Sequence, residues 1–306
     1  MEKYYITTPI YYVNDKPHIG HAYTTILADT ISRFRDLIGQ KPTFLTGLDE
    51  HGLKVQQAAE KNGKAPQDHC DSMAPAFIDL WKKLNINYSD FIRTTENRHT
   101  KIVQKILTKV HESGDIYMDE YEGWYSISEE RFITEKELDS GQFGEVKKIK
   151  EKNYFFKMSK YQQTLIDKIE KDELLIQPKS RKNEVLGFLK NELSDLCISR
   201  PKSRLEWGIE LPFNNNYVTY VWFDALINYI SAIGVYKNHE QFSELWPANV
   251  HLIGKDILTT HSVYWPTMLL SLGLQLPQRI FAHGWWLTDD KKMSKSLGNV
   301  VSPLML

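Results

Sequence analysis

The stretch Pro17-His18-Ile19-Gly20-His21 stands where a short apolar run gives way to a helical pattern. His18 and His21 fall in the first turn of the predicted helix, where unpaired backbone N–H groups and the helix dipole favour a phosphate. Gly20 between them has no side chain, so a flat base or a ribose can approach the backbone closely. The stretch predicts a nucleotide site, although a helix start with two solvated histidines would explain these residues taken alone.

The helix is predicted over residues 18–39, and the apolar run before it, residues 3–10, predicts a buried strand. Apolar residues recur every three to four positions along the helix, so one face is expected to be buried. These residues are Ile19, Ala22, Ile26, Leu27, Ile31, Phe34 and Ile38.

A second stretch near the end of the chain, Lys292-Met293-Ser294-Lys295-Ser296, places two lysines in a loop-like segment. Two ammonium groups on a flexible loop suit a polyphosphate whose charge must be held while its bonds rearrange. A solvated turn would explain this loop on its own. Together, and in this order, the two stretches resemble the HIGH and KMSKS signature motifs of class I aminoacyl-tRNA synthetases.

Length and composition set wider bounds. A chain of 306 residues exceeds what a single core usually fills, so one large domain with an insertion, or two domains, is expected. The net charge of −1 gives no global indication of nucleic-acid binding. The first residues lack the apolar core of a signal peptide, and no run approaches a membrane span. We therefore predict a cytoplasmic location, with no membrane and no DNA partner.

Strands alternate with helices in the first and last parts of the chain, which argues for a parallel sheet covered on both faces. After the first helix, a strand near residues 42–46 and helices over 53–61, 66–84 and 97–113 are predicted. The alternation returns with a strand at 217–222, a helix at 224–233, and strands at 250–253 and 279–286. The predicted fold class is α/β, a Rossmann-like doubly wound parallel sheet, in which ligands bind at the carboxyl ends of the strands.

A β-rich connective insertion is predicted between these parts, because aromatic residues scattered among turns follow Ile116. The predicted ranges are 1–115 and 216–306 for the two halves of the catalytic domain and 116–215 for the insertion. Between Lys147 and Lys190, 12 Lys or Arg stand against 6 Asp or Glu. This imbalance fits either a solvated surface or docking of a tRNA acceptor arm. Lys157-Met158-Ser159-Lys160 nearly repeats the lysine loop, but it runs into a helical pattern and is interpreted as structural.

Further stretches resemble methionyl-tRNA synthetase, and this resemblance covers the whole chain. They are Thr8–Asn14, Gly47–Gly52, Val221–Leu226, Ile253–Asp256 and His283-Gly284. The resemblance implies a methionine pocket made of Ile10, Tyr12, Asp49, Trp222, Ala225, Leu226, Tyr229, Ile257 and His261. It implies an ATP site made of His18, Gly20, His21, Gly254, Asp256, His283, Lys292, Lys295 and Ser296.

The chemistry of these residue types agrees with that assignment. Trp222 and Tyr12 suit the walls of an apolar slot, Tyr229 and His261 are candidate donors to a thioether sulfur, and Asp49 is an anion for the substrate ammonium. Ordinary packing would also explain the aromatic residues, and His261 would equally serve as a core histidine.

The resemblance implies attack of the methionine carboxylate on the α-phosphate of ATP, with Mg²⁺ on the phosphates, followed by transfer to the acceptor end of tRNA(Met). A carboxylate is already ionised, so catalysis consists of positioning and charge stabilisation. The implied catalytic residues are His18, His21, Lys292 and Lys295.

Two departures from the family pattern stand out. Where relatives often carry a CxxC knuckle, this chain has Ser126 and Glu129, and Cys70 and Cys197 form no CxxC pair. We therefore predict no structural zinc, no protein metal site and a reducing compartment. The family also continues into an anticodon-binding domain beyond the point where this chain stops, at Leu306, so that domain is expected to be absent.

Two rival interpretations remain open. A leucine-, isoleucine- or cysteine-type synthetase shares both signature motifs, and pocket shape separates side chains one methylene apart only weakly. A non-catalytic, synthetase-like RNA-binding module is the other alternative. The intact pairs His18/His21 and Lys292/Lys295 argue against it, since a binding module has no use for them.

Overall fold

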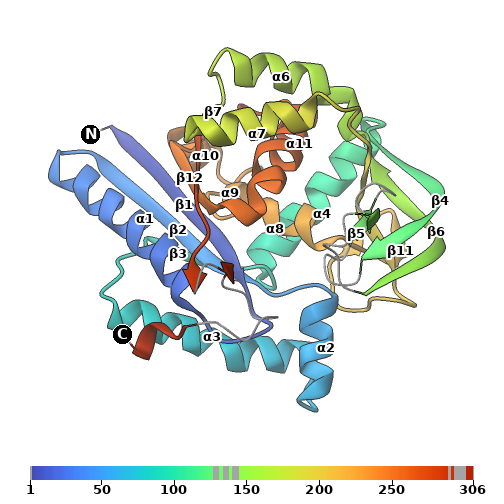
Figure 1. Ribbon diagram of the computed structural model, residues 1–306, viewed down its shortest axis with the longest axis horizontal. Helices are drawn as coiled ribbons and strands as arrows, with labels where there is room; N and C mark the ends of the chain where they lie inside the picture. The colour runs from blue at the N-terminus through green and yellow to red at the C-terminus, as the bar shows by residue number, and fades with distance from the viewer. Residues whose placement is uncertain are drawn as a thin grey trace.

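The computed structural model describes residues 2–126, 131–133, 138–139, 145–288, 291–292 and 301–305. Its central element is a six-stranded sheet with the order β3-β2-β1-β12-β13-β7, in which every neighbouring pair is parallel (Figure 1). The strands are β1 (Lys3–Tyr12), β2 (Lys41–Asp49), β3 (Asp90–Arg93), β7 (Leu175–Gln177), β12 (Val250–Gly254) and β13 (Arg279–His283). The predicted Rossmann-like parallel sheet is confirmed.

Helices cover both faces of this sheet, as the alternation of side chains along β1 requires. Tyr4 and Ile6 pack on one face with Ala28 of α1 (Ile19–Leu37). Tyr5, between them, faces the other side and packs in the largest apolar cluster with residues of α4 and α11. The helices besides α1 are α2 (Leu53–Lys61), α3 (Pro66–Lys83), α4 (Asn97–Glu112), α6 (Gln162–Glu170), α7 (Lys179–Leu189), α8 (Val221–Leu226), α9 (Asn228–Ser231), α10 (His239–Leu245) and α11 (Trp265–Ser271).

The strand order reverses beside β1. From β1 the chain moves outward to β2 and β3, and later it returns on the other side of β1 through β12 and β13. The connections that leave β1 and β12 therefore lead to opposite sides of the sheet. A crevice opens between their carboxyl ends, which is where open α/β sheets bind ligands.

Helix α1 begins at Ile19, one residue after the predicted start, and its buried face is only partly the predicted one, since Ala22, Leu27 and Ile31 do pack against the core. Ile26, Phe34 and Ile38 were expected to be buried, and they are 43%, 53% and 51% exposed. The face against the sheet instead carries small and polar side chains, which let the helix lie close to the strands. Its buried members are Ala22, Thr24, Thr25, Ala28, Asp29 and Ser32.

The prediction of a strand over residues 217–222 is partly wrong. β11 (Asn214–Thr219) ends at Thr219, and it pairs antiparallel with β9 (Ser199–Pro201) and β10 (Glu210–Leu211), outside the parallel sheet. Helix α8 then begins at Val221, three residues before the predicted start. Val221 and Phe223 are apolar types common in strands, but both are buried against the core as part of a helix, so tertiary packing overrides their propensity. The strand predicted over 279–286 likewise ends earlier, at His283.

The predicted insertion contains an antiparallel sheet of β5 (Arg131–Ile133), β4 (Ile116–Ser126), β6 (Val146–Phe156) and β8 (Leu196–Cys197), in that order. Strand β7 lies within the range 116–215, yet it forms the edge of the main sheet beside β13. The predicted boundaries of the three ranges stay a prediction. The segment Lys157–Lys160 was interpreted as structural, and its contacts agree: Met158 is buried, and Lys160 forms an ion pair with Asp115.

None of the helices in the part of the chain that the structure describes is long and apolar enough to cross a membrane.

Gly47 generates a prediction about stability. It lies in β2 opposite Ile92 of β3, and a Cβ at Gly47 would stand 2.0 Å from the carbonyl oxygen of Ile92. Gly47→Ala must push the two strands apart, and we expect it to lower the free energy of unfolding by about 3 kcal/mol. Gly187→Ala, in α7 with no atom within 4 Å of the added carbon, is the control and should be neutral or stabilising. Equal denaturation midpoints for the two variants would contradict this account.

Candidate active site

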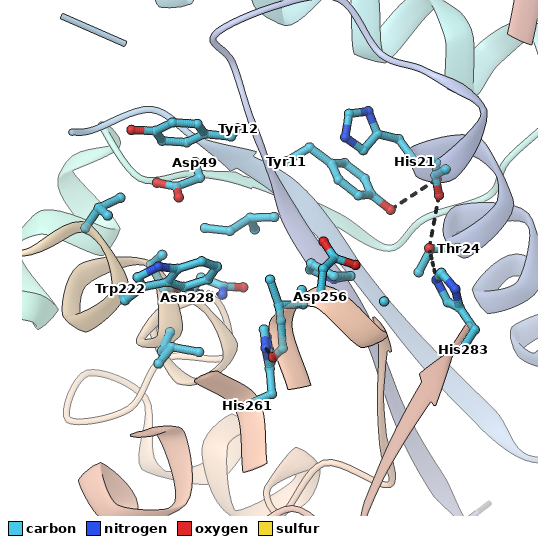
Figure 2. Close-up of a pocket in the computed structure, with 18 of the residues that line it drawn as sticks. Tyr11, Tyr12, His21, Thr24, Asp49, Trp222, Asn228, Asp256, His261 and His283 are labelled. Atoms are coloured by element: carbon cyan, nitrogen blue, oxygen red, sulfur yellow. Dashed lines mark hydrogen bonds between the residues drawn. The ribbon is translucent and has the colours of Figure 1, made fainter. Parts of the chain in front are cut away.

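A cavity of about 440 Å³ opens at the carboxyl ends of β1, β2 and β12. Figure 2 shows its two ends: Tyr12, Asp49 and Trp222 lie at one, and His21, Thr24 and His283 lie at the other. Of the predicted site residues, all but three line this cavity. They are Ile10, Tyr12, His18, Gly20, His21, Asp49, Trp222, Ala225, Leu226, Tyr229, Gly254, Asp256, Ile257, His261 and His283.

The other three belong to the lysine loop. Lys295 and Ser296 lie outside the described residues, and of Lys292 only the backbone, in β15 (Lys291–Lys292), is described. The roles predicted for all eighteen residues stay predictions, since position along a cavity does not establish a role.

Several residues that line the cavity are not among the predicted site residues. Thr24 lies four residues after Gly20 on α1, and Asn228 lies three residues after Ala225, so helical spacing from these two predicted site residues would have found both. Trp285 and Trp286 follow the His283-Gly284 motif directly. The full set of missed residues is Pro9, Tyr11, Thr24, Lys54, Val221, Asn228, Gly284, Trp285 and Trp286.

The start of α1 shows how the two motif histidines are oriented. The backbone N–H of Gly20 donates to His18 Nδ1 (3.1 Å), and the backbone N–H of His18 donates to His21 Nδ1 (3.2 Å), which forms a reciprocal capping box. The two rings stack with their centroids 3.7 Å apart. Because each Nδ1 accepts a hydrogen bond, each neutral ring carries its proton on Nε2. That tautomer presents two N–H donors of the kind that bind phosphate oxygens.

His283 joins this helix to the end of β13. Its Nδ1–H donates to the carbonyl oxygen of Gly284 (2.8 Å), so its Nε2 accepts from the hydroxyl of Thr24 (2.7 Å). Nearby, a Cβ on Gly254 would stand 2.6 Å from Oδ1 of Asp256. Only glycine therefore leaves room for the Asp256 carboxylate in its present position at the centre of the cavity (Figure 2).

The hydroxyl of Tyr229 is hydrogen-bonded to His261 at the buried end of the cavity. His261 Nδ1 lies 2.9 Å from the carbonyl oxygen of Ile257, so this nitrogen carries the ring proton and donates it. His261 Nε2 must then accept from the Tyr229 hydroxyl, at 2.7 Å. Burial lowers the pKa of His261 to about 4, so the ring is neutral at physiological pH. Both protons are thus donated to protein acceptors, and donation to a thioether sulfur requires the Tyr229 proton to leave His261.

His251 supports Tyr229 from behind. Its ring stacks on that of Tyr229 with the centroids 4.2 Å apart, and it is completely buried. Trp265 Nε1–H donates to His251 Nε2 (3.2 Å), so His251 Nδ1–H donates to the hydroxyl oxygen of Thr7 (2.7 Å). Burial holds the pKa of His251 well below its usual value. This end of the cavity is built from neutral imidazoles whose hydrogen bonds are all internal.

No group of three or more His, Cys, Asp or Glu side chains among the described residues is placed to hold a metal ion. Ser126 belongs to β4, and Glu129 lies outside the described residues, so the prediction that the insertion needs no zinc stays a prediction.

The fold and the cavity together define an α/β protein with a cavity at the switch point of a parallel sheet. The chain matches the family model described as tRNA synthetases class I (M) over residues 4–142 and 139–306. It is 53% identical to a methionine–tRNA ligase of Clostridium tetani and 48% identical to one of Bacillus subtilis, each over 99% of this chain and 48% of the relative. The chain belongs to the class I tRNA synthetases of the methionine type, and it spans about half the length of these relatives.

Solved structures agree with this placement. The Mycobacterium tuberculosis methionyl-tRNA synthetase in complex with methionyl-adenylate superposes with a TM-score of 0.94 at 42% identity, covering 100% of this chain and 61% of that one. The apo form of the same enzyme gives a TM-score of 0.78 at 39% identity, covering 93% and 56%. By this measure, the backbone of the present chain is more similar to the adenylate-bound form than to the apo form.

The buried histidines predict how stability depends on pH. Unfolded histidine takes up a proton below a pKa of about 6.5, whereas His251 and His261 stay neutral in the folded state. Their folded pKa values are lowered, so acid favours the unfolded chain. Each histidine should remove about 1.4 kcal/mol of stability per pH unit below 6.5, until its folded pKa is reached.

His251→Gln retains one donor and one acceptor but cannot be protonated. We expect the free energy of unfolding to fall by about 2 kcal/mol less in this variant than in the wild type between pH 7.5 and pH 5. His239→Gln, at an exposed histidine, is the control and should keep the wild-type pH dependence. Urea denaturation at the two pH values measures the difference, and parallel losses in all three proteins would refute the assignment.

Proposed function

We propose that this chain activates L-methionine with ATP, forming methionyl-adenylate and pyrophosphate. The observation that carries the proposal is the single cavity that joins a helix N-terminus of phosphate-binding type to a buried, apolar and aromatic slot (Figure 2). The match to the methionine-type family model and the similarity to an adenylate-bound relative support it. They also favour methionine over the leucine-, isoleucine- and cysteine-type alternatives.

The proposed reaction is attack of the methionine carboxylate oxygen on the α-phosphorus of ATP. The new C–O–P linkage forms as the bond to the bridging oxygen breaks, and pyrophosphate leaves with its electron pair. The nucleophile is already an anion, so no general base is needed. His18 and His21 would donate from Nε2 to phosphate oxygens, and Lys292 and Lys295 would stabilise the charge that develops on pyrophosphate. Mg²⁺ would arrive on the phosphates as part of the nucleotide substrate.

One end of the cavity would bind methionine, and the other end would bind ATP. Asp49, 6% exposed, would hold the methionine ammonium, and Trp222, Ala225 and Leu226 would enclose the side chain. Gly254, Asp256 and His283, beside His21, would hold the nucleotide. A ligand that spans both ends brings its carboxylate and α-phosphate together near the centre.

Transfer of the methionyl group to the 3′ end of tRNA(Met) is the second proposed step. The basic part of the insertion gives it little support. Seven of its twelve basic side chains form ion pairs, two of them with acidic residues of the neighbouring strand β4 that lie outside the counted segment. The pairs are Lys147–Glu145, Lys148–Glu122, Lys150–Glu120, Lys160–Asp115, Lys168–Glu173, Arg181–Glu184 and Lys182–Asp172. This balance favours a solvated surface over a docking site for the acceptor arm.

The test of the proposed function is ATP–pyrophosphate exchange by the purified chain, screened over all twenty amino acids. We expect exchange that depends on methionine and is at least a hundredfold weaker with leucine, isoleucine or cysteine. Exchange with none of the twenty, in a chain that is folded by circular dichroism, would favour the non-catalytic alternative. Exchange with another amino acid would reassign the substrate.

A second prediction concerns Asp49. Asp49→Asn removes the negative charge that would pair with the substrate ammonium, and a hydrogen bond between charged groups contributes about 1.5–3 kcal/mol. The KM for methionine should therefore rise about 10- to 100-fold, while the KM for ATP stays within a factor of two.

A methionine analogue without the amino group provides the control for Asp49. The wild type and Asp49→Asn should bind the desamino analogue, 4-(methylthio)butanoate, with the same weak affinity. The analogue has no ammonium, so neither protein can form the ion pair with it. If Asp49→Asn instead weakens binding of the analogue as much as binding of methionine, this carboxylate shapes the cavity and does not bind the ammonium.

A further inference from the structure

Asp224 carries a completely buried carboxylate that receives hydrogen bonds from two histidines. His51 Nδ1 lies 2.6 Å from one carboxylate oxygen, and His99 Nε2 lies 2.7 Å from the other. The two histidines come from different elements: His51 lies in the loop between β2 and α2, and His99 lies in the first turn of α4. One carboxylate on α8 therefore connects three parts of the fold.

The network extends to α9. His99 Nδ1 lies 2.8 Å from the hydroxyl of Ser231, and that hydroxyl lies 3.3 Å from the carbonyl oxygen of Asn228, to which it can donate. Asn228 lines the cavity. The chain of contacts from Asp224 therefore runs through His99 and Ser231 to the backbone carbonyl of Asn228, a residue that lines the cavity.

The loop of His51 is also held from its other side. Arg93 Nε donates to the Glu50 carboxylate (2.7 Å), Thr95 donates to the same group, and Thr94 accepts from the backbone N–H of Glu50 (3.0 Å). These bonds tie Glu50 to the end of β3. On the opposite side, the hydrogen bond between His51 and Asp224 connects the loop to α8.

This placement matters because α8 and the end of β2, which leads into the loop of His51, both line the cavity. Trp222, Ala225 and Leu226 of α8 line it, and Asp49, two residues before His51, lines it from β2. Asp224 is not one of the described residues that line the cavity. Its carboxylate instead connects α8 to the loop of His51.

We propose that Asp224 is a positioning residue for the amino-acid end of the site: its carboxylate, held between His51 and His99, fixes Asp49 relative to Trp222. This inference rests on the proposed function, which assigns that end of the cavity to the amino acid. Asp224 touches no substrate in this account. It acts through Asp49 and Trp222, which would.

The ionisation of Asp224 agrees with the geometry. Burial by itself would raise the pKa of this carboxyl, but the charge and hydrogen bond of His51, with the bonds from His99, hold the pKa below its usual value. The carboxylate is therefore ionised at neutral pH. A buried anion of this kind is costly unless both partners are kept, so it restricts the relative positions of the elements that carry them.

Many buried ion pairs only stabilise a fold, and the experiment has to separate that effect from positioning. Asp115 offers a matched control. Its carboxylate is 2% exposed, receives hydrogen bonds from Lys160 (2.7 Å), Ser271 (2.8 Å) and Tyr161, and lies away from the cavity lining. Asp224→Asn and Asp115→Asn each replace a buried carboxylate by an amide of the same size.

The test is pyrophosphate exchange by both variants at pH 7.5, with KM measured separately for methionine and ATP. Asp224→Asn should raise the KM for methionine about tenfold or more and leave the KM for ATP within a factor of two. Asp115→Asn should lower the melting temperature comparably and leave both KM values within a factor of two. An unchanged KM for methionine in Asp224→Asn, or an equal rise in both KM values, would overturn the inference.

His99 supplies the second pair of variants, which decides the matter if Asp224→Asn does not fold. His99→Gln retains a donor that can reach Asp224, whereas His99→Leu has none. The inference requires the KM for methionine to rise at least fivefold more in the leucine variant, and equal values would overturn it. All comparisons use the amino acid that the wild type activates. If methionine is not the substrate, the wild type will show no methionine-dependent exchange. If Asp224 has no positioning role, the wild type will be active and only the KM values of the variants will disagree with the inference.

Discussion

The structure depends on one constraint, the need to bury both faces of a parallel sheet whose strand order reverses beside β1. Tyr4 and Ile6 pack on α1, and Tyr5 packs on the opposite side, so β1 is covered above and below as well as paired on both edges. The connections that leave β1 and β12 must then lead to opposite sides of the sheet. The cavity follows from this connectivity, and its position would be the same with other side chains around it.

The end of the cavity that we propose for the nucleotide is preorganised by local bonding. His18 and His21 satisfy backbone N–H groups in the first turn of α1 and one backbone group in front of it, and in doing so they fix their own tautomers. A ligand that binds there does not have to order these rings first, which lowers the entropic cost of binding. His283 and Thr24 then fix the helix start relative to β13, from the other side of the reversal.

The end that we propose for the amino acid is built differently. Its polar groups lie in the interior, where an unpaired donor or acceptor is costly, so Tyr229, His261, His251 and Asp224 are hydrogen-bonded to other protein groups. The partners are His261 for Tyr229, the carbonyl of Ile257 for His261, Thr7 and Trp265 for His251, and His51 and His99 for Asp224. Such a site has few free donors to offer a substrate. Its selectivity must come mostly from the shape that the buried network maintains, which fits a ligand whose distinguishing group is a weakly accepting thioether.

The sequence by itself determined the features that local bonding controls. Residues 17–21 specify the helix start because His18, Gly20 and His21 lie within four positions, and the bounds predicted for α2, residues 53–61, match the structure. The resemblance also supplied the residues of the two cavity ends, although their roles remain to be tested. Apolar periodicity located α1 and core-facing Ala22, Leu27 and Ile31, but it wrongly placed Ile26, Phe34 and Ile38 on the buried face, because it cannot show that small side chains are needed where a helix lies close to a sheet.

Only the tertiary structure decided which polar groups are paired in the interior. Asp224 meets His51 and His99 across 173 and 125 residues of chain, and Thr24 meets His283 across 259. No spacing in the sequence encodes such contacts, because they arise when strands far apart in the chain become neighbours in the sheet. The same physics turned Val221 and Phe223 into part of a helix, since burial against the core outweighs the preference of either residue for a strand.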